Sequence, residues 1–232
     1  MKFSVVTVCY NAETTIEETI KSVLAQDFNF VEYIIIDGNS CDNTLNIIKK
    51  YLDKVVLVSE PDHGIYDAMN KGLTKATGDF LIFMGADDVF YSSKVLSKIA
   101  ANIDDKRSVY YGNVLRLKDN RIYDGAFTKW MWGYKNICHQ AIFYPKSIYK
   151  NKKYDVEYKL VADWVYNLEL LANNVSFTFV DVVVSRYNDI DGASSTKIDK
   201  KFLELRRGII IDAVGIFPYL WGVFNKIKNK IL

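Results

Sequence analysis

The chain contains 232 residues, of which 50% are hydrophobic and 25% are charged, a composition typical of a globular protein with one large domain, or one domain and an appendage. The net charge of +2, without a basic block in the first two hundred residues, argues against nucleic-acid binding. Cys9, Cys41 and Cys138 are widely spaced and form no CxxC pair, which argues against a disulfide framework or a zinc site and favours a reducing cytosol. The N-terminal residues begin a strand pattern at once, so we expect no signal peptide.

The first ninety residues alternate short apolar runs with segments of helical periodicity. Strands are predicted at 3–9, 31–36, 55–58 and 80–84, and helices at 16–24, 45–52 and 65–73. The candidate helix caps are a Thr14/Glu17 or Thr15/Glu18 capping box for the first helix, and Ser40 or Asp42 for the second. This alternation predicts an α/β fold with a mostly parallel sheet.

The second half has a different pattern. A helix is predicted at 93–101, a hairpin of strands 109–117 and 121–127, an aromatic loop at 130–134, a strand at 141–144, a helix at 161–171 and a long strand at 176–187. We therefore expect antiparallel strands to extend the parallel sheet.

The C-terminal segment 208–224 is apolar except for Asp212, and Gly215, Pro218 and Gly222 interrupt it. It falls short of the ~20 uninterrupted apolar residues of a membrane-spanning helix. A basic tail follows, with lysines at 226, 228 and 230. Two interpretations remain open at this stage: a helix lying on an anionic membrane surface, and a helix packed on the domain.

Carboxylates follow two of the predicted parallel strands, Asp37 after the second and the pair Asp87–Asp88 after the fourth. Ligands of open α/β sheets bind beyond the carboxyl ends of the strands, so both lie where a nucleotide would bind. Asp37 could accept hydrogen bonds from the base or ribose, while Asp87 and Asp88 hold a divalent cation against the diphosphate. Oxygen ligands favour Mg²⁺ or Mn²⁺. The alternative for the pair is a polar loop that caps the next helix.

Four ordered motifs resemble family 2 glycosyltransferases of the GT-A fold, of the bacterial surface-polysaccharide assembly type. They are residues 5–11 (VVTVCYN), 34–44 (IIIDGNSCDNT), 60–72 (EPDHGIYDAMNKG), and 78–79 (GD) together with 85–88 (GADD). The resemblance covers roughly residues 3 to 190. It implies a Rossmann-like, mostly parallel nucleotide-binding sheet with an antiparallel extension. The implied domain is 1–200, with a nucleotide-binding half (1–105) and an acceptor-binding half (106–200), followed by a helical segment at 201–232.

The resemblance also implies roles for individual residues. The implied nucleotide-binding residues are Thr7, Tyr10, Asn11, Asp37, Asp62, Lys71 and Asp87, with Tyr10 offering a ring for stacking. Asp88, with Asp87, would bind Mg²⁺ or Mn²⁺. Asp163, in the segment LVADW, would be the general base, and a helix cap or surface charge is its alternative. The implied substrate contacts are Glu60, His139, Gln140 and Arg186, although His139 could instead be a structural histidine.

Two positions depart from the family pattern: Gly85 stands where many relatives have the first Asp of Asp-x-Asp, and Ala162 replaces the Glu of a Glu-Asp pair. The Gln-x-x-Arg-Trp motif of processive synthases is absent, which favours a single transfer per encounter. Trp130, Trp132 and Tyr134 could stack on sugar rings or belong to the edge of the core.

The resulting expectation is an inverting, metal-dependent glycosyltransferase. It would transfer a sugar from a nucleotide-diphosphate sugar to a hydroxyl of a glycan or lipid-linked acceptor, in the cytoplasm or peripherally on the inner face of the plasma membrane, during cell-surface polysaccharide biosynthesis. Two alternatives are a polyprenyl-phosphate glycosyltransferase, whose phosphate acceptor needs no general base, and a non-catalytic nucleotide-sugar-binding module.

Overall fold

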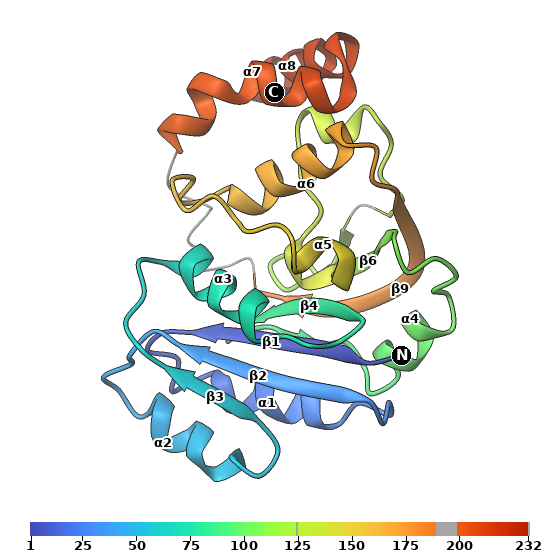
Figure 1. The fold of residues 1–232 in the computed structure, drawn as a ribbon. Coiled ribbons are helices and arrows are strands. Elements are labelled where there is room, and N and C mark those ends of the chain that lie inside the picture. Colours follow the sequence, from blue (N-terminus) through green and yellow to red (C-terminus); the bar gives the residue numbers. More distant parts are fainter. Residues whose placement is uncertain (124, 189–198, 232) are drawn as a thin grey trace.

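The computed structural model describes residues 1–123, 125–188 and 199–231 (Figure 1). The strands are β1 (Phe3–Cys9), β2 (Val31–Asp37), β3 (Val56–Ser59), β4 (Phe80–Gly85), β5 (Val89–Phe90), β6 (Val109–Arg116), β7 (Ile122–Tyr123), β8 (Ile142–Pro145) and β9 (Phe177–Tyr187). The α-helices are α1 (Ile16–Leu24), α2 (Thr44–Ile48), α3 (Ile65–Lys75), α4 (Val95–Ala100), α5 (Lys146–Tyr149), α6 (Ala162–Ala172), α7 (Lys200–Val214) and α8 (Ile216–Ile231). Short 3₁₀ helices are η1 (Lys49–Tyr51), η2 (Met131–Gly133) and η3 (His139–Ala141).

The first four strands form the parallel half of the sheet, in the order β3-β2-β1-β4. Cys9 pairs with Asp37, and Asp37 pairs with Ser59, so the carboxyl ends of these strands meet at one edge. Val6 and Phe83 pack with Met69 of α3 on one face of the sheet, whereas Val5 and Ile20 pack on the other face. Burial on both faces explains the continuous apolar runs and confirms the predicted parallel sheet.

The second half extends the sheet with mixed strand directions. β8 pairs antiparallel with both β4 and β6, and β7 pairs antiparallel with β6, as the hairpin prediction required. The long strand β9, however, runs parallel to β6, and β5 pairs antiparallel with β9. The predicted antiparallel extension is therefore confirmed by β7 and β8, whereas the β6–β9 pair, whose direction was not predicted, is parallel. Gly112 allows this pairing, because a Cβ at this position would overlap the carbonyl oxygen of Val182.

Helix capping differs from the prediction at the first two helices. Thr15 is the N-cap of α1 but its side chain makes no capping hydrogen bond, so the predicted capping box is wrong. A backbone turn replaces it, in which the amides of Thr15 and Ile16 donate to the carbonyl oxygen of Ala12. At the second helix Asp42 accepts from the amide of Thr44 at 3.0 Å. The N-cap of α2 is nevertheless Asn43, whose side chain makes no capping hydrogen bond, so neither of the two candidates, Ser40 and Asp42, is the N-cap.

The C-terminal helices form a layer over α6, at the opposite end of the molecule from α1 and α2 (Figure 1). α7 packs against α6, and α8 packs against α7 and η2. A Cβ on Gly133 of η2 would overlap the carbonyl oxygen of Pro218, and one on Gly222 would overlap that of Gly133. One side of α8 therefore packs backbone to backbone on the domain. None of the helices in the described ranges is both long and apolar enough to cross a bilayer.

Candidate active site

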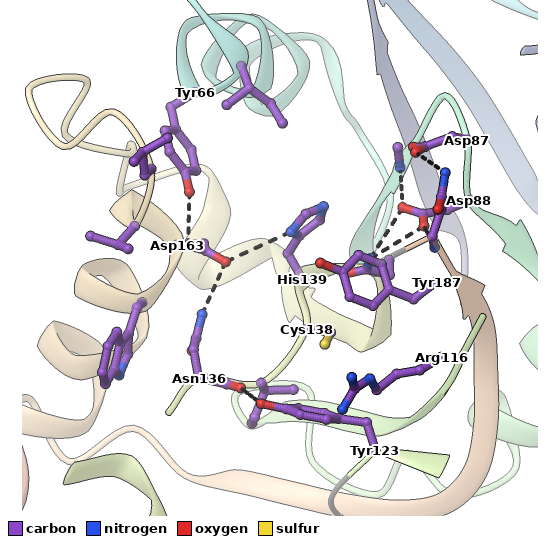
Figure 2. Close-up of a pocket in the computed structure, with 18 of the residues that line it drawn as sticks. Tyr66, Asp87, Asp88, Arg116, Tyr123, Asn136, Cys138, His139, Asp163 and Tyr187 are labelled. Atoms are coloured by element: carbon purple, nitrogen blue, oxygen red, sulfur yellow. Dashed lines mark hydrogen bonds and ion pairs between the residues drawn. The ribbon is translucent and has the colours of Figure 1, made fainter. Parts of the chain in front are cut away.

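A pocket of about 570 Å³ opens where the two halves of the sheet meet. Its wall is built from the end of β4, the segment before η3, the first turn of α6 and the residues at the end of β9. Asp87, Asp88, His139 and Asp163 all line it, and Figure 2 shows His139 between Asp163 and the Asp87–Asp88 pair. The structure thus gathers acidic side chains from distant parts of the sequence around one imidazole.

Asp163 lies in the first turn of α6, and Val161 rather than Asp163 is the N-cap. The Tyr66 hydroxyl donates to one carboxylate oxygen at 2.9 Å, and the Asn136 amide donates to the other at 3.1 Å. Nδ1 of His139 lies 3.8 Å from the second oxygen. Burial keeps the pKa of the Tyr66 hydroxyl well above its usual value, so this group remains a donor. The carboxylate is held in one orientation facing the pocket (Figure 2).

Asp88 is the buried member of the acidic pair and is 3% exposed. Its carboxylate accepts from the amide of Gly85 at 3.0 Å and from Nε2 of Gln140 at 3.3 Å. Burial raises the pKa of this carboxyl to about 6; the nearby His139 lowers it and the charge of Asp87 raises it. Asp87 is exposed and accepts from the Asn188 side-chain amide at 3.1 Å. Burial disfavours the ionised form of such a carboxyl group, and a cation that binds to it stabilises this ionised form.

The acidic pair fits a cation that a substrate diphosphate shares. Among the residues that the structure describes, no three His, Cys, Asp or Glu side chains are grouped to hold a metal. Magnesium sites of phosphate-transferring enzymes, however, commonly use one or two carboxylates together with phosphate oxygens. Two adjacent carboxylates at a strand end, one of them buried, satisfy this requirement.

The electrostatics of His139 connect the two acidic sites. Burial lowers the pKa of the imidazole, but the carboxylate of Asp163 and the charges of Asp88 and Asp87 outweigh this effect, so the pKa is raised. The protonated form is therefore stabilised within the pocket. The protonated imidazole of His139 can contact a phosphate oxygen or a sugar hydroxyl.

A second group of predicted residues lies at the carboxyl ends of β1, β2 and β3. Tyr10 is 63% exposed, and its ring lies close to Gly38. A Cβ on Gly38 would overlap a carboxylate oxygen of Asp62, which in turn accepts from the amide of Gly64 at 2.9 Å. Tyr10, Gly38 and Asp62 thus meet at one point of this edge, and a flat base can approach the exposed tyrosine ring there.

Three other predicted nucleotide-binding residues make contacts within the protein. Asp37 is fully buried, and its carboxylate accepts from Ser40 Oγ at 2.5 Å and from Ser59 Oγ at 2.7 Å. Thr7 is also fully buried and shares a 3.0 Å hydrogen bond with the Tyr33 hydroxyl. Asn11 accepts from the amide of Cys41 at 3.0 Å. In this structure these side chains connect the strand ends and the loops of the edge.

Lys71, Glu60 and Arg186 do not line the pocket. Lys71 lies 3.2 Å from Glu60 and donates to the carbonyl oxygen of Pro61, which ties the loop before α3 to the helix. Arg186 lies 3.0 Å from Glu18 of α1. The assignment of these three residues to substrate or nucleotide binding therefore stays a prediction. Tyr187 and Asn188, which follow Arg186, line the pocket in its place.

Sequence reasoning missed several residues that the fold brings to the pocket. The pocket-lining residues not assigned a role from sequence include Tyr66, Arg116, Tyr123, Asn136, Lys159 and Asn188. Tyr66 lay inside a quoted motif, and Asn136 lies three residues before His139. Among the predicted sugar-stacking aromatics, Trp132 is buried against Phe127 and Phe177, so it belongs to the core.

Comparison with known proteins agrees with this geometry. Residues 4–173 match the family model described as Glycosyl transferase family 2. The chain belongs to this family. The PGL/p-HBAD biosynthesis glycosyltransferase of Mycobacterium tuberculosis is 34% identical over 211 residues, which cover 87% of this chain and 82% of the relative. The Escherichia coli UDP-Glc:alpha-D-GlcNAc-diphosphoundecaprenol beta-1,3-glucosyltransferase WfaP is 26% identical and covers 92% of this chain and 86% of its own.

Solved structures share the fold. Staphylococcus aureus TarS residues 1–349, in complex with UDP-GlcNAc, superposes with a TM-score of 0.73 at 23% identity, covering 91% of this chain and 66% of that one. A mannosyltransferase from Pyrobaculum calidifontis, PcManGT, in complex with GDP-Man and Mn²⁺, has a TM-score of 0.67 at 16% identity, covering 84% and 58%. The mixed sheet with its parallel half is thus the GT-A fold, as predicted.

Replacing Tyr66 with phenylalanine is expected to lower kcat about 10- to 100-fold, because a hydrogen bond to a charged group contributes roughly 1.5–3 kcal/mol. The donor KM should remain unchanged, since Tyr66 contacts Asp163 and not the acidic pair. Steady-state kinetics with a donor and acceptor would measure both constants. Tyr51→Phe is the matched control, because Tyr51 donates to Glu17 at the same 2.9 Å outside the pocket. An equal fall in kcat in both variants would contradict the positioning role.

Proposed function

We propose that this protein is an inverting glycosyltransferase that moves a sugar from a nucleotide-diphosphate sugar to a hydroxyl of a glycan or lipid-linked acceptor in cell-surface polysaccharide assembly. The observation that carries the proposal is the orientation of Asp163, which Tyr66 and Asn136 hold facing the pocket that the Asp87–Asp88 pair also lines. Residues 1–105 would bind the nucleotide, and residues 106–200 would bind the acceptor.

In the proposed reaction Asp163 acts as the general base. The acceptor oxygen attacks the anomeric carbon while the bond from this carbon to the diphosphate oxygen breaks. The hydroxyl proton passes to the Asp163 carboxylate, and the nucleotide diphosphate leaves with the bonding electron pair. Because attack and departure occur on opposite faces of the sugar, a single displacement inverts the anomeric configuration.

The donor would lie along the edge from Tyr10 to Asp88. The exposed Tyr10 ring would stack on the base, and Asp62 lies beside it. Asp88, with Asp87, would hold Mg²⁺ or Mn²⁺, which when bound neutralises charge on the departing diphosphate. His139, whose protonated form the surrounding carboxylates stabilise, would contact a phosphate or a sugar hydroxyl.

The substrates and ligands of similar proteins support this assignment. WfaP acts on a sugar linked to diphosphoundecaprenol, and solved GT-A structures hold UDP-GlcNAc or GDP-Man with Mn²⁺. Arg116 and Lys159 line the pocket here, and their positive charges suit an acceptor that bears phosphate. The same charges favour a second candidate, a polyprenyl phosphate as the acceptor itself, in which the phosphate oxygen attacks and no base is needed.

For either acceptor we place the protein in the cytoplasm, peripherally on the inner membrane face, with residues 208–232 as the contact.

A panel of UDP-, GDP- and dTDP-sugars, each with and without Mn²⁺, tests the proposal. We expect one donor class to raise the melting temperature, since a ligand at 100 times its Kd stabilises the folded protein by about 2.7 kcal/mol. We also expect slow hydrolysis of that donor. If no nucleotide sugar shifted the melting temperature with or without metal, the enzyme proposal would be overturned. Binding without any hydrolysis or transfer would favour a non-catalytic module.

A further inference from the structure

An exposed apolar surface runs along α8. Phe217, Leu220, Trp221 and Phe224 repeat at three- and four-residue intervals, which places them on one side of the helix. They are 71%, 52%, 46% and 58% exposed. We call this set the α8 apolar face. Large apolar side chains grouped in this way on a surface indicate an interaction site.

The packing of α8 fixes the direction of this face. On the other side of the helix Pro218 and Gly222 are buried against η2, in the backbone-to-backbone contact described above. Trp130, from the segment before η2, is 48% exposed and its ring lies 6.1 Å from that of Trp221. The α8 apolar face therefore points away from the domain, and Trp130 widens it.

The charge of the C-terminal helices is opposite to that of the rest of the chain. Residues 199–232 contain seven basic and three acidic residues, a net charge of +4, whereas residues 1–198 have a net charge of −2. Three of the lysines, at 226, 228 and 230, occupy the helical turns that follow Phe224. An aromatic face followed along the helix by basic turns matches the two properties of an anionic bilayer surface, an apolar interior and negative headgroups.

We propose that α8 lies on an anionic lipid bilayer, with Phe217, Leu220, Trp221 and Phe224 inserted among the lipids and Trp130 at the interface. A second copy of the chain is a weaker occupant, because a symmetric contact would bring like charges of two basic helices together. The inference rests on the proposed function, since η2 lies within the acceptor half and leads to Asn136 and His139 of the pocket. The contact would hold that half beside the membrane that carries a lipid-linked acceptor.

Vesicle co-sedimentation of the full chain tests this surface. The probes are phosphatidylcholine vesicles and vesicles of phosphatidylcholine with 30% phosphatidylglycerol. We expect binding to the anionic vesicles that weakens at high salt, and at least a tenfold loss of binding in the double variant W221Q/F224Q. The matched control is L52Q/V56Q, which replaces two apolar residues of 52% and 54% exposure on the opposite part of the molecule, and it should bind like the wild type. All four positions are exposed, and circular dichroism would verify folding.

The outcomes separate this inference from the proposed function. Failure of the wild type to bind anionic vesicles, or equal binding by W221Q/F224Q, would overturn the membrane contact. A dimer seen by light scattering that W221Q/F224Q abolishes, without vesicle binding, would assign the face to a second copy and would also overturn it. Hydrolysis of the donor in solution does not depend on vesicles. If W221Q/F224Q still hydrolyses the donor but no longer binds vesicles, the inference is supported. If the wild type itself does not hydrolyse any donor, this result counts against the proposed function alone.

Discussion

Replacement of Asp163 by asparagine is expected to lower turnover about 10²- to 10⁴-fold, the usual contribution of a general base. Asparagine has nearly the same shape as aspartate but cannot accept the proton of the acceptor hydroxyl. One of its oxygen positions still accepts from Tyr66 or Asn136, so the pocket should keep its form. Donor binding, measured by thermal shift with Mn²⁺, should remain within a fewfold of the wild type because the acidic pair is unchanged.

The control for this change is Asp212→Asn, which removes an exposed carboxylate from α7, outside the pocket, and should leave kcat unchanged. The test also separates the two acceptor classes. Full activity of Asp163→Asn would show that Asp163 is not the base, and it would favour a phosphate acceptor, whose oxygen is already ionised. Loss of donor binding together with activity would instead indicate that the substitution disturbs the whole pocket.

The parallel half of the sheet was predictable because its strands are buried on both faces. Val5 and Val6 pack on opposite sides of β1, so the apolar run is continuous, and such a run by itself indicates a strand of a buried parallel sheet. The direction of β9 was not predictable in the same way. Its partner β6 lies some seventy residues earlier, and the pairing depends on Gly112 approaching the backbone near Val182. Local pattern gives the existence of such a strand and not its partner.

The candidate site shows the same division. Asp88, His139 and Asp163 were identified from motifs, and the fold places all three on one pocket. The contacts that orient Asp163 were missed, because Tyr66 is 97 residues away in the sequence and meets it only when the fold brings both residues to the same pocket. Asp37 illustrates the opposite case: its position after a strand suggested an open ligand, but Ser40 and Ser59 enclose its carboxylate. Neighbouring hydroxyl groups decide whether an acid at a strand end is open.

Replacement of Asp88 by asparagine is expected to abolish the metal-dependent part of donor binding without lowering stability. The raised pKa of about 6 means that the folded protein binds a proton on Asp88 between about pH 4 and 6 that the unfolded chain has released. The free energy of unfolding therefore falls as the pH rises through this window, by up to roughly 3 kcal/mol. Asp88→Asn lacks this titration, so at pH 7.5 it should be at least as stable as the metal-free wild type.

Thermal unfolding in EDTA from pH 4.5 to 7.5, followed by titration with Mn²⁺ and the donor, measures both effects. Asp87→Asn is the matched control for stability. Burial is the largest cause of the raised Asp88 pKa, so the fall in stability with rising pH should persist in this variant, reduced by the loss of the Asp87 charge. In the wild type Mn²⁺ and donor should restore the stability that the ionised Asp88 removes, and in Asp88→Asn they should not. Metal-dependent donor binding of wild-type strength in Asp88→Asn would exclude Asp88 as the cation ligand. A variant much less stable than the wild type at pH 7.5 would show that the ionised carboxylate is already compensated by Gly85 and Gln140.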